Sequence, residues 1–231
     1  MSDETEGDPD DADEDDAPST RETLDELGFY DNDVTEFPPE LSGVKRFKAE
    51  GRAEPLVEAL GLQGYDVGFM RLEMIEALGR IGDEAAVPAL VDELGDGDTN
   101  VAAMEALARI GSADAVDEIA EKLDPEKRVE PRVRAAAADA LGELGDDGAV
   151  DALVEILDSD SPRVRAAAAD ALGEIGDDGP VEALSGLLEA DESEKVRASA
   201  AGALASIDTA DARETLSEYD DDANELVRRA V

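Results

Sequence analysis

Carboxylates are the side chains that could do chemistry in this sequence, because most other candidates are scarce or missing. Asp and Glu number 62 against 20 Lys and Arg, which gives a formal net charge of −42, and the chain has no His, Cys or Trp. Disulfides, thiolate nucleophiles, Cys or His zinc sites and imidazole acid–base catalysis are therefore excluded. The negative field opposes binding to DNA, RNA and anionic lipid, and it favours basic proteins, cations or a very salty solvent.

One short segment has the alternating acids of a calcium-binding loop. This segment, GDGDTN, occupies residues 95–100. Val101 stands where such a loop needs glycine, and Leu107 stands where it needs a bidentate Glu. We therefore expect no metal site and no cofactor, only weak association of cations with the acidic surface.

Two rows of charged side chains recur at fixed distances before an Ile or Leu landmark. Five residues before it, the first charge row comprises Glu76, Glu105, Asp139, Asp170 and Gly202. One residue before it, the second charge row comprises Arg80, Arg109, Glu143, Glu174 and Ser206. The first row is acidic in four copies and the second changes from Arg to Glu, so a groove lined by both would orient a protein with complementary charges. A solvated helix face is the alternative. Apolar anchors for such a partner are expected at Phe69, Leu72, Ile75 and Met104.

A second pattern links Arg to Asp. Arg recurs ten residues before the landmark at Arg71, Arg134, Arg165 and Arg197, and Asp follows the landmark at Asp83, Asp146 and Asp177. One copy has Asn100 and Ser112 instead, so both charges are missing together. This covariation within the chain predicts a structural ladder of Arg–Asp hydrogen bonds, from the start of each helix to the turn that follows it. In the last copy Arg197 faces Thr209, next to Asp208. A row of ligand-binding Arg is the alternative.

The elements that position these residues follow from an internal repeat. The segment RVRAAAADALGE at 132–143 recurs unchanged at 163–174, an offset of 31 residues, and weaker copies extend in both directions. Self-similarity at this period predicts a solenoid of stacked helix pairs, in which each charge row crosses the array.

Each copy has the pattern of two helices. The apolar positions Val133, Ala136, Ala137, Ala140, Leu141 and Leu144 form the stripe of one helix face. Ser161 followed by Pro162 predicts a helix start, and Gly145 and Gly176 predict left-handed helix ends. We expect an all-α, right-handed α-solenoid with a first helix of about eleven residues and a second of about thirteen in each unit. The pairs are expected at 53–80, 84–110, 113–144, 148–175 and 179–207, with a partial sixth at 209–231.

The residues before the array differ in composition. Residues 1–19 are nearly all acidic or small, which predicts a disordered acidic tail. Residues 20–52 contain Phe29, Tyr30, Phe37 and Phe47, which predicts either a plug that covers the open end of the array at 53–231 or a docking segment. No apolar run approaches the roughly 18 residues that cross a membrane, and the start is acidic rather than basic, so we expect a cytoplasmic protein.

The charge balance also suggests an environment. Arg outnumbers Lys, Asp slightly exceeds Glu, and Cys is absent, a composition that resembles cytoplasmic proteins of extreme halophiles, chiefly haloarchaea. At molar salt the Debye length falls to about 3 Å, which screens repulsion between carboxylates. An acidic mesophilic protein is the alternative.

The repeat resembles the HEAT-like repeat first described in phycobilisome lyases. The pattern V-R-x-x-A-A-x-A-L-G-x-I-G-D, followed by V-x-A-L, is clearest from Val164 to Leu184, and the resemblance covers about 53–231. It implies a fold in which second helices line a concave face, and it implies scaffolds and adaptors rather than one activity.

We therefore expect a non-enzymatic protein-interaction scaffold in a halophile cytoplasm, with another protein bound on the concave face. The resemblance implies signalling adaptors, for example between taxis proteins and the motility motor. A lyase-like enzyme or enzyme subunit that holds a small molecule is the alternative. HEAT-like hydroxylases use His-Glu motifs to bind iron, which the absence of His excludes. The oligomeric state stays open.

Overall fold

The computed structural model describes residues 42–61, 68–95 and 97–218. The acidic tail at 1–19 and the aromatic residues Phe29, Tyr30 and Phe37 lie outside the described residues.

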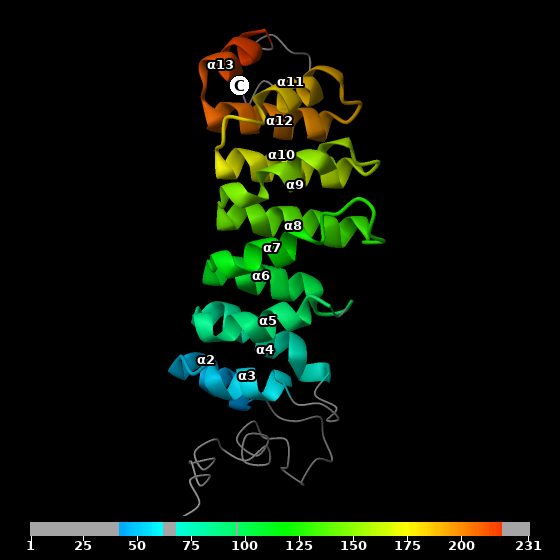
Figure 1. Cartoon of the computed structure of the whole chain (residues 1–231). Coiled ribbons are helices and arrows are strands. Elements are labelled where there is room, and N and C mark those ends of the chain that lie inside the picture. Colours follow the sequence, from blue (N-terminus) through cyan, green and yellow to red (C-terminus); the bar gives the residue numbers. More distant parts are fainter. Residues whose placement is uncertain (1–41, 62–67, 96, 219–231) are drawn as a thin grey trace, which may run out of the picture.

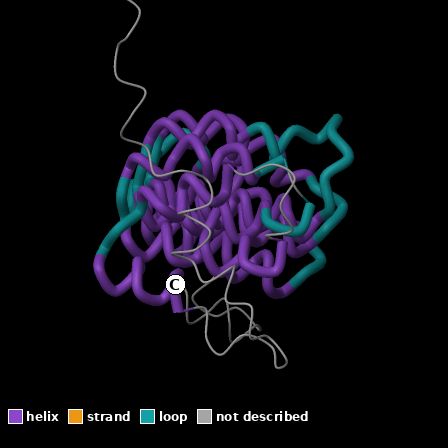
Figure 2. Tube along the Cα trace, turned by 90° about the horizontal axis from the view of Figure 1, so that it is seen from below, coloured by secondary structure: helices purple, strands orange, loops and turns teal. Residues whose placement is uncertain are grey.

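The described residues form a single column of stacked helices and contain no strand (Figure 1). The α-helices are α2 (Ser42–Glu50), α3 (Glu54–Gly61), α4 (Gly68–Ile81), α5 (Val87–Glu93), α6 (Asn100–Ile110), α7 (Val116–Ala120), α8 (Pro131–Leu144), α9 (Val150–Glu155), α10 (Pro162–Ile175), α11 (Val181–Ala190), α12 (Glu194–Ile207) and α13 (Ala210–Ser217). Seen along the column, helices fill the centre and most loops gather at two edges (Figure 2). The expected all-α solenoid is confirmed.

The expected helix pairing is also confirmed for five units. These pairs are α3 with α4, α5 with α6, α7 with α8, α9 with α10, and α11 with α12, and α13 begins the sixth. Each second helix packs against the next second helix along the column, from α4 through α6, α8 and α10 to α12. The charge rows therefore cross successive neighbouring helices, as the repeat requires.

The first helices are shorter than expected. Instead of about eleven residues, α5 has seven and α7 has five. A 3₁₀ turn precedes each of them, at Glu84–Ala86 and Ala113–Ala115, and takes up the start of the helix.

The apolar stripe of each second helix forms the core. Val133, Ala137, Ala140 and Leu141 of α8 are buried, as are the corresponding residues of α10. The solenoid core is thus continuous from unit to unit, and Ala is its most frequent residue on the second helices.

Glycine in the second helices permits close helix contact. A Cβ on Gly173 of α10 would lie 2.6 Å from the Cα of Ala203 on α12. A Cβ on Gly142 of α8 would lie 2.8 Å from the Cα of Ala171 on α10. The backbones of neighbouring second helices approach more closely than any larger residue would allow.

The predicted helix ends are confirmed. Gly145 and Gly176 end α8 and α10 with φ of 66° and 78°, the left-handed conformation that glycine adopts without strain. Pro162 is the first residue of α10 and Ser161 precedes it with extended backbone, but the Ser161 side chain makes no capping hydrogen bond.

One end of the column is covered by α2, which packs against α3 and α4. Its Phe47 is fully buried, and the guanidinium groups of Arg46 and Arg52 lie 4.8 and 4.9 Å from the centre of the ring. This helix falls inside the segment 20–52 that was expected to cap or dock.

Candidate functional site

The expected Arg–Asp ladder is wrong. Arg71 and Asp83 are separated by twelve residues of helix and cap, a rise of about 18 Å, which an arginine side chain cannot span. The same separation holds for Arg134 with Asp146 and for Arg165 with Asp177.

The aspartates of that pattern have a different role. The Oδ1 of Asp83 accepts a hydrogen bond from the Ala85 backbone N–H at 3.0 Å, and Asp146 and Asp177 accept equivalent bonds two residues on, each at 2.8 Å. They cap the start of the next unit. Ser112, the exception in the sequence, makes no such bond.

The four arginines donate hydrogen bonds to the turn before their own helix. Two of them, Arg165 and Arg71, also pair with a carboxylate of the next repeat. Arg165 donates to the Ser159 carbonyl oxygen at 2.8 Å, and Arg197 donates to the Asp191 carbonyl oxygen at 2.9 Å. Arg165 also donates to the Asp191 carboxylate at 2.7 and 2.9 Å. This ion pair, with help from the Ser193 backbone N–H, holds the pKa of Asp191 below its usual value.

The other two arginines keep the carbonyl contacts. Arg71 donates to the Leu60 carbonyl oxygen at 3.2 Å and pairs with the buried Glu93. Arg134 donates to the Asp124 and Lys127 carbonyl oxygens, and its buried Nε has no partner. The repeat pattern does not reveal the carboxylate partners, because Glu93 and Asp191 do not occupy the same position in their repeats.

The charge rows divide the face of the second helices into two parts. On α4 and α6, each acid of the first row pairs with the Arg of the second row one turn later. Glu76 pairs with Arg80, and Glu105 accepts from Arg109 at 3.3 Å. These four residues are exposed and neutralise one another, so they offer a partner little net charge.

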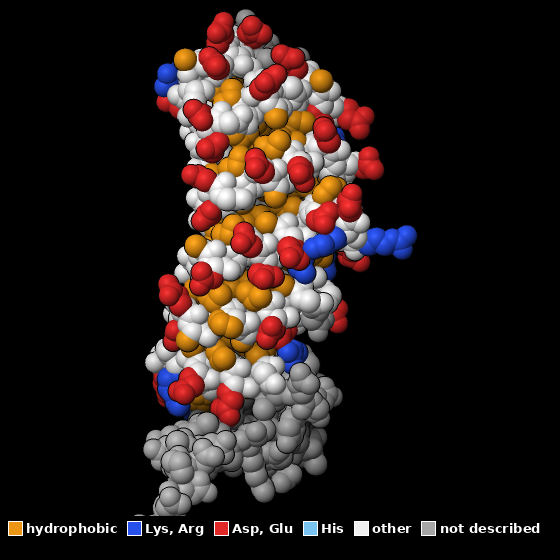
Figure 3. Space-filling view, in the orientation of Figure 1, with side chains coloured by type: hydrophobic (Ala, Val, Ile, Leu, Met, Phe, Trp, Pro, Cys, Tyr) orange, Lys and Arg blue, Asp and Glu red, His pale blue; other side chains and the backbone are white. Residues whose placement is uncertain are grey.

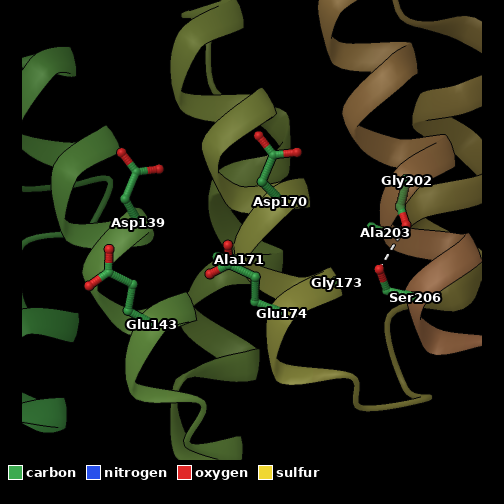
Figure 4. A pocket seen from close by; sticks show the side chains of 9 residues that line it. All are labelled: Asp139, Glu143, Asp170, Ala171, Gly173, Glu174, Gly202, Ala203 and Ser206. Atoms are coloured by element: carbon green, nitrogen blue, oxygen red, sulfur yellow. Dashed lines mark hydrogen bonds between the residues drawn. The ribbon is translucent and has the colours of Figure 1, made fainter. Parts of the chain in front are cut away.

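On α8 and α10 both rows are acidic and form a groove (Figure 4). Asp139 and Glu143 project from α8, Asp170 and Glu174 project from α10, and the small residues Gly202 and Ser206 of α12 leave one side open. We call this the acidic groove, and its volume is about 560 Å³. In the part of the chain that the structure describes, none of its four carboxylates forms an ion pair.

The electrostatics of the groove reflect this crowding. Partial burial raises the pKa of the Asp139, Asp170 and Glu174 carboxyl groups, and the negative charges of neighbouring groove residues add to the effect at Asp139 and Glu174. Glu174 reaches over the backbone of Gly142, where a Cβ would lie 2.5 Å from its Oε2. The groove therefore concentrates negative charge that no ion pair among the described residues neutralises.

Sequence reasoning missed a row of cations beside the groove. Arg132, Arg163 and Lys195 occupy one repeated position near the start of α8, α10 and α12, and all three are exposed. The repeat spacing that predicts the two charge rows also predicts this row of cations, because each cation stands one residue before Val133, Val164 or Val196.

Two of the expected apolar anchors are wrong. Met104 and Ile75 are fully buried in the core, because their helix positions face neighbouring helices. Leu72 is 48% exposed, and the side chain of Phe69 lies outside the described residues.

Within the described ranges, no group of acidic side chains is arranged to hold a metal ion. Asp96 of the 95–100 segment lies outside them. None of the described helices has the length and apolar character needed to span a bilayer. Acidic side chains are scattered over the visible face along the whole described column, between patches of hydrophobic side chains (Figure 3).

Solved structures share the architecture. The CpcE–CpcF complex of phycocyanin lyase from Nostoc sp. PCC7120 is similar with a TM-score of 0.51 and 19% identity, over 97% of each chain. An engineered protein has a TM-score of 0.50 and 24% identity, over 81% of this chain and 92% of that one. Human deoxyhypusine hydroxylase has a TM-score of only 0.38 at 20% identity, over 84% and 88%. For the first two structures, at 19% and 24% identity, the likeness concerns the fold alone.

Comparison of the sequence with profiles of protein families identifies the family of this chain. No protein of curated function matches the chain. The profile of HEAT repeats matches residues 94–163 and 151–231, and that of the PBS lyase HEAT-like repeat matches 70–96. The HEAT match spans more than half of the chain and coincides with the stacked helix pairs, so this protein belongs to the HEAT repeat family.

Proposed function

We propose that this protein is a non-enzymatic scaffold that holds a basic segment of another protein in the acidic groove. The observation that carries the proposal is the contrast between two parts of one face. Glu76 and Glu105 are paired within their own helices, whereas Asp139 and Asp170 at the same repeated positions form no ion pair with any described residue. Lys and Arg side chains of a partner would supply the missing charge.

The groove lies on the second helices, which we propose to be the concave, partner-binding face. Its walls combine carboxylates with small residues, so backbone and long side chains of a partner can enter. The net charge of −42 would also speed the encounter with a basic partner and oppose nucleic acid.

A lyase-like role with a small molecule is the alternative, since one similar structure is a phycocyanin lyase complex. The groove favours the scaffold because it offers no free hydroxyl or amine nucleophile. The Ser206 hydroxyl donates to the Gly202 carbonyl oxygen at 3.1 Å within its own helix, and the remaining polar side chains are carboxylates.

We further propose that the protein works in the cytoplasm of a halophile, where multi-molar KCl screens repulsion among its carboxylates. An adaptor role in signalling, such as taxis or motility, fits this proposal. The partner's identity would decide it.

The test is affinity capture from a haloarchaeal lysate in multi-molar KCl, followed by calorimetry with the purified partner. The groove variant is Asp139→Asn/Asp170→Asn. The matched control, Glu76→Gln/Glu105→Gln, removes the same charge from the same row. We expect the groove variant to weaken binding about tenfold or more and the control to change it little. Equal loss in both variants, or a bound small molecule in mass spectra and no protein partner, would contradict the scaffold.

A further inference from the structure

The acidic groove has a basic end. Arg132, Arg163 and Lys195 stand near the first turns of α8, α10 and α12, and none of them forms an ion pair with any described residue. These three exposed cations lie in consecutive units at one repeated position.

The cations and the groove acids share one face of each helix. On α10, Asp170 follows Arg163 by seven residues and Glu174 follows it by eleven, offsets that return to the same side of a helix. The separations along the helix axis are about 10 and 16 Å. Asp139 and Glu143 follow Arg132 on α8 with the same offsets.

The two ends are electrostatically connected. The positive charges of Arg163 and Lys195 oppose the rise in the pKa of Asp139, and Lys195 does the same for Asp170. The cations therefore lie within electrostatic reach of the groove acids on neighbouring helices.

Small residues separate the two ends. Four residues after each cation stand Ala136, Ala167 and Ser199. Ala167 and Ser199 are buried, so no long side chain rises between the basic row and the acidic groove. An approaching helix can therefore contact this middle strip closely.

We infer that the occupant of the groove is a bipolar helix, acidic at one end and basic at the other, that lies along α8, α10 and α12. The inference rests on the proposed function and names the partner's chemistry. An acid at one position of the partner would meet Arg163 and Lys195, and Lys or Arg seven and eleven residues away would enter the acidic groove. Such a segment needs about twelve residues, or three helical turns.

A uniformly basic segment fits this surface less well. Its cations would meet the groove acids at one end and the basic row at the other, where like charges repel. The basic row thus selects against the polybasic segments that any acidic surface attracts. The equivalent positions of the two preceding units are Phe69 on α4 and Asp98 before the start of α6, so among the described second helices this bipolar surface is confined to α8, α10 and α12.

The test uses the full chain and two synthetic helical peptides that differ only at one end. The bipolar peptide carries two Glu at that end and Lys seven and eleven residues later, and the basic peptide has Lys in place of Glu. Binding is measured by calorimetry at the lowest KCl concentration at which circular dichroism shows the protein fully folded. We expect the bipolar peptide to bind about tenfold more tightly than the basic one.

A charge-reversal variant gives the decisive comparison. In Arg163→Glu/Lys195→Glu the preference is expected to reverse, so that the basic peptide binds more tightly. The milder Arg163→Gln/Lys195→Gln serves if the reversal variant is unfolded, and it is expected to abolish the preference. If both peptides bind wild type equally and Asp170→Asn/Glu174→Gln weakens both, the bipolar inference fails and the scaffold proposal stands. If neither peptide binds, or if groove variants change nothing, the proposed groove itself fails.

Orientation provides an independent readout. The protein has no Cys, so a nitroxide on a single Cys of the peptide is the only label in the complex. A label at the acidic end should broaden amide signals near Arg163 and spare those near Glu174. Equal broadening at both ends would overturn the inference.

Discussion

Arg165 donates two hydrogen bonds to the carboxylate of Asp191 in the following repeat, with Nε 2.7 Å from Oδ2 and Nη2 2.9 Å from Oδ1. The side chains are only 11% and 4% exposed. The third guanidinium nitrogen donates to the Ser159 carbonyl oxygen, so one side chain joins the turn before its own helix to the turn of the next unit. A forked, charge-assisted contact of this kind is among the stronger polar interactions in proteins.

Removing one partner should therefore destabilise the array. We expect Asp191→Asn to lower the free energy of unfolding by about 2 kcal/mol, because it leaves a mostly buried guanidinium without its countercharge. Urea denaturation followed by circular dichroism measures the change. Asp208→Asn is the matched control, since Asp208 makes a similar fork to Arg213 but both side chains are 62% exposed. Equal midpoint shifts in the two variants would contradict a structural role for the buried pair.

Two glycines of the second helices should respond oppositely to alanine. Gly173→Ala places a Cβ 2.6 Å from the Cα of Ala203, so we expect a loss of about 1–3 kcal/mol. Gly202→Ala meets no atom within 4 Å and should stabilise α12 by up to about 1 kcal/mol. Thermal denaturation of both variants checks the signs. A neutral Gly173→Ala would show that the helices can separate without cost.

Mild acid should stabilise the fold through the acidic groove. The raised pKa of Asp139 and Asp170 means that the folded state binds protons more readily than the unfolded chain, so an unfavourable charge is relieved as pH falls through the folded pKa. Asp191 acts in the opposite sense. Its lowered pKa means that its contribution is present above the unfolded value and is lost only at lower pH.

The difference between two pH profiles isolates the groove from the other carboxylates. The stability gain of wild type between neutral pH and the pH at which Asp191 protonates should shrink in Asp139→Asn/Asp170→Asn. Thermal melts at constant ionic strength provide the profiles. If the melting temperatures of both proteins change equally with pH, repulsion among the groove carboxylates does not affect stability.

Salt should control folding as strongly as any substitution. With a net charge of −42, we expect helical circular dichroism and the melting temperature to fall as KCl is removed, because repulsion among carboxylates loses its screening. A titration of KCl at neutral pH measures this, with uncharged sucrose as a control for general exclusion effects. A melting temperature that is independent of KCl would contradict the halophile proposal.

The sequence predicted most of the fold because every local signal agreed. Period, apolar stripe, Pro162 at a helix start and Gly145 at a helix end all specify the same helix pair. The site was harder. The positions of Asp139 and Asp170 in a row followed from the register, but whether a charge is paired depends on side-chain contacts that spacing alone does not give.

The Arg–Asp prediction failed for a related reason. Arg71 and Asp83 vary together with the repeat, yet covariation inside a repeat does not require contact. Each residue serves its own unit: the arginine binds a preceding turn, and the aspartate caps the following one. The prediction of Met104 as an exposed anchor is wrong because a large apolar side chain at a position that is Ala in other repeats fills the core instead of projecting into solvent.

Asn100 lacks the contacts that arginine makes at this position in the other units. It stands where the other units have arginine, and its buried Oδ1 has no hydrogen-bond partner. In a repeat array, stability is a sum over units and nearest-neighbour interfaces, so a unit that lacks these contacts is the place where the array should open first. Opening should begin beside α6, and the units from α8 to α12, which carry the acidic groove, would stay folded together while the units before them exchange their amide hydrogens.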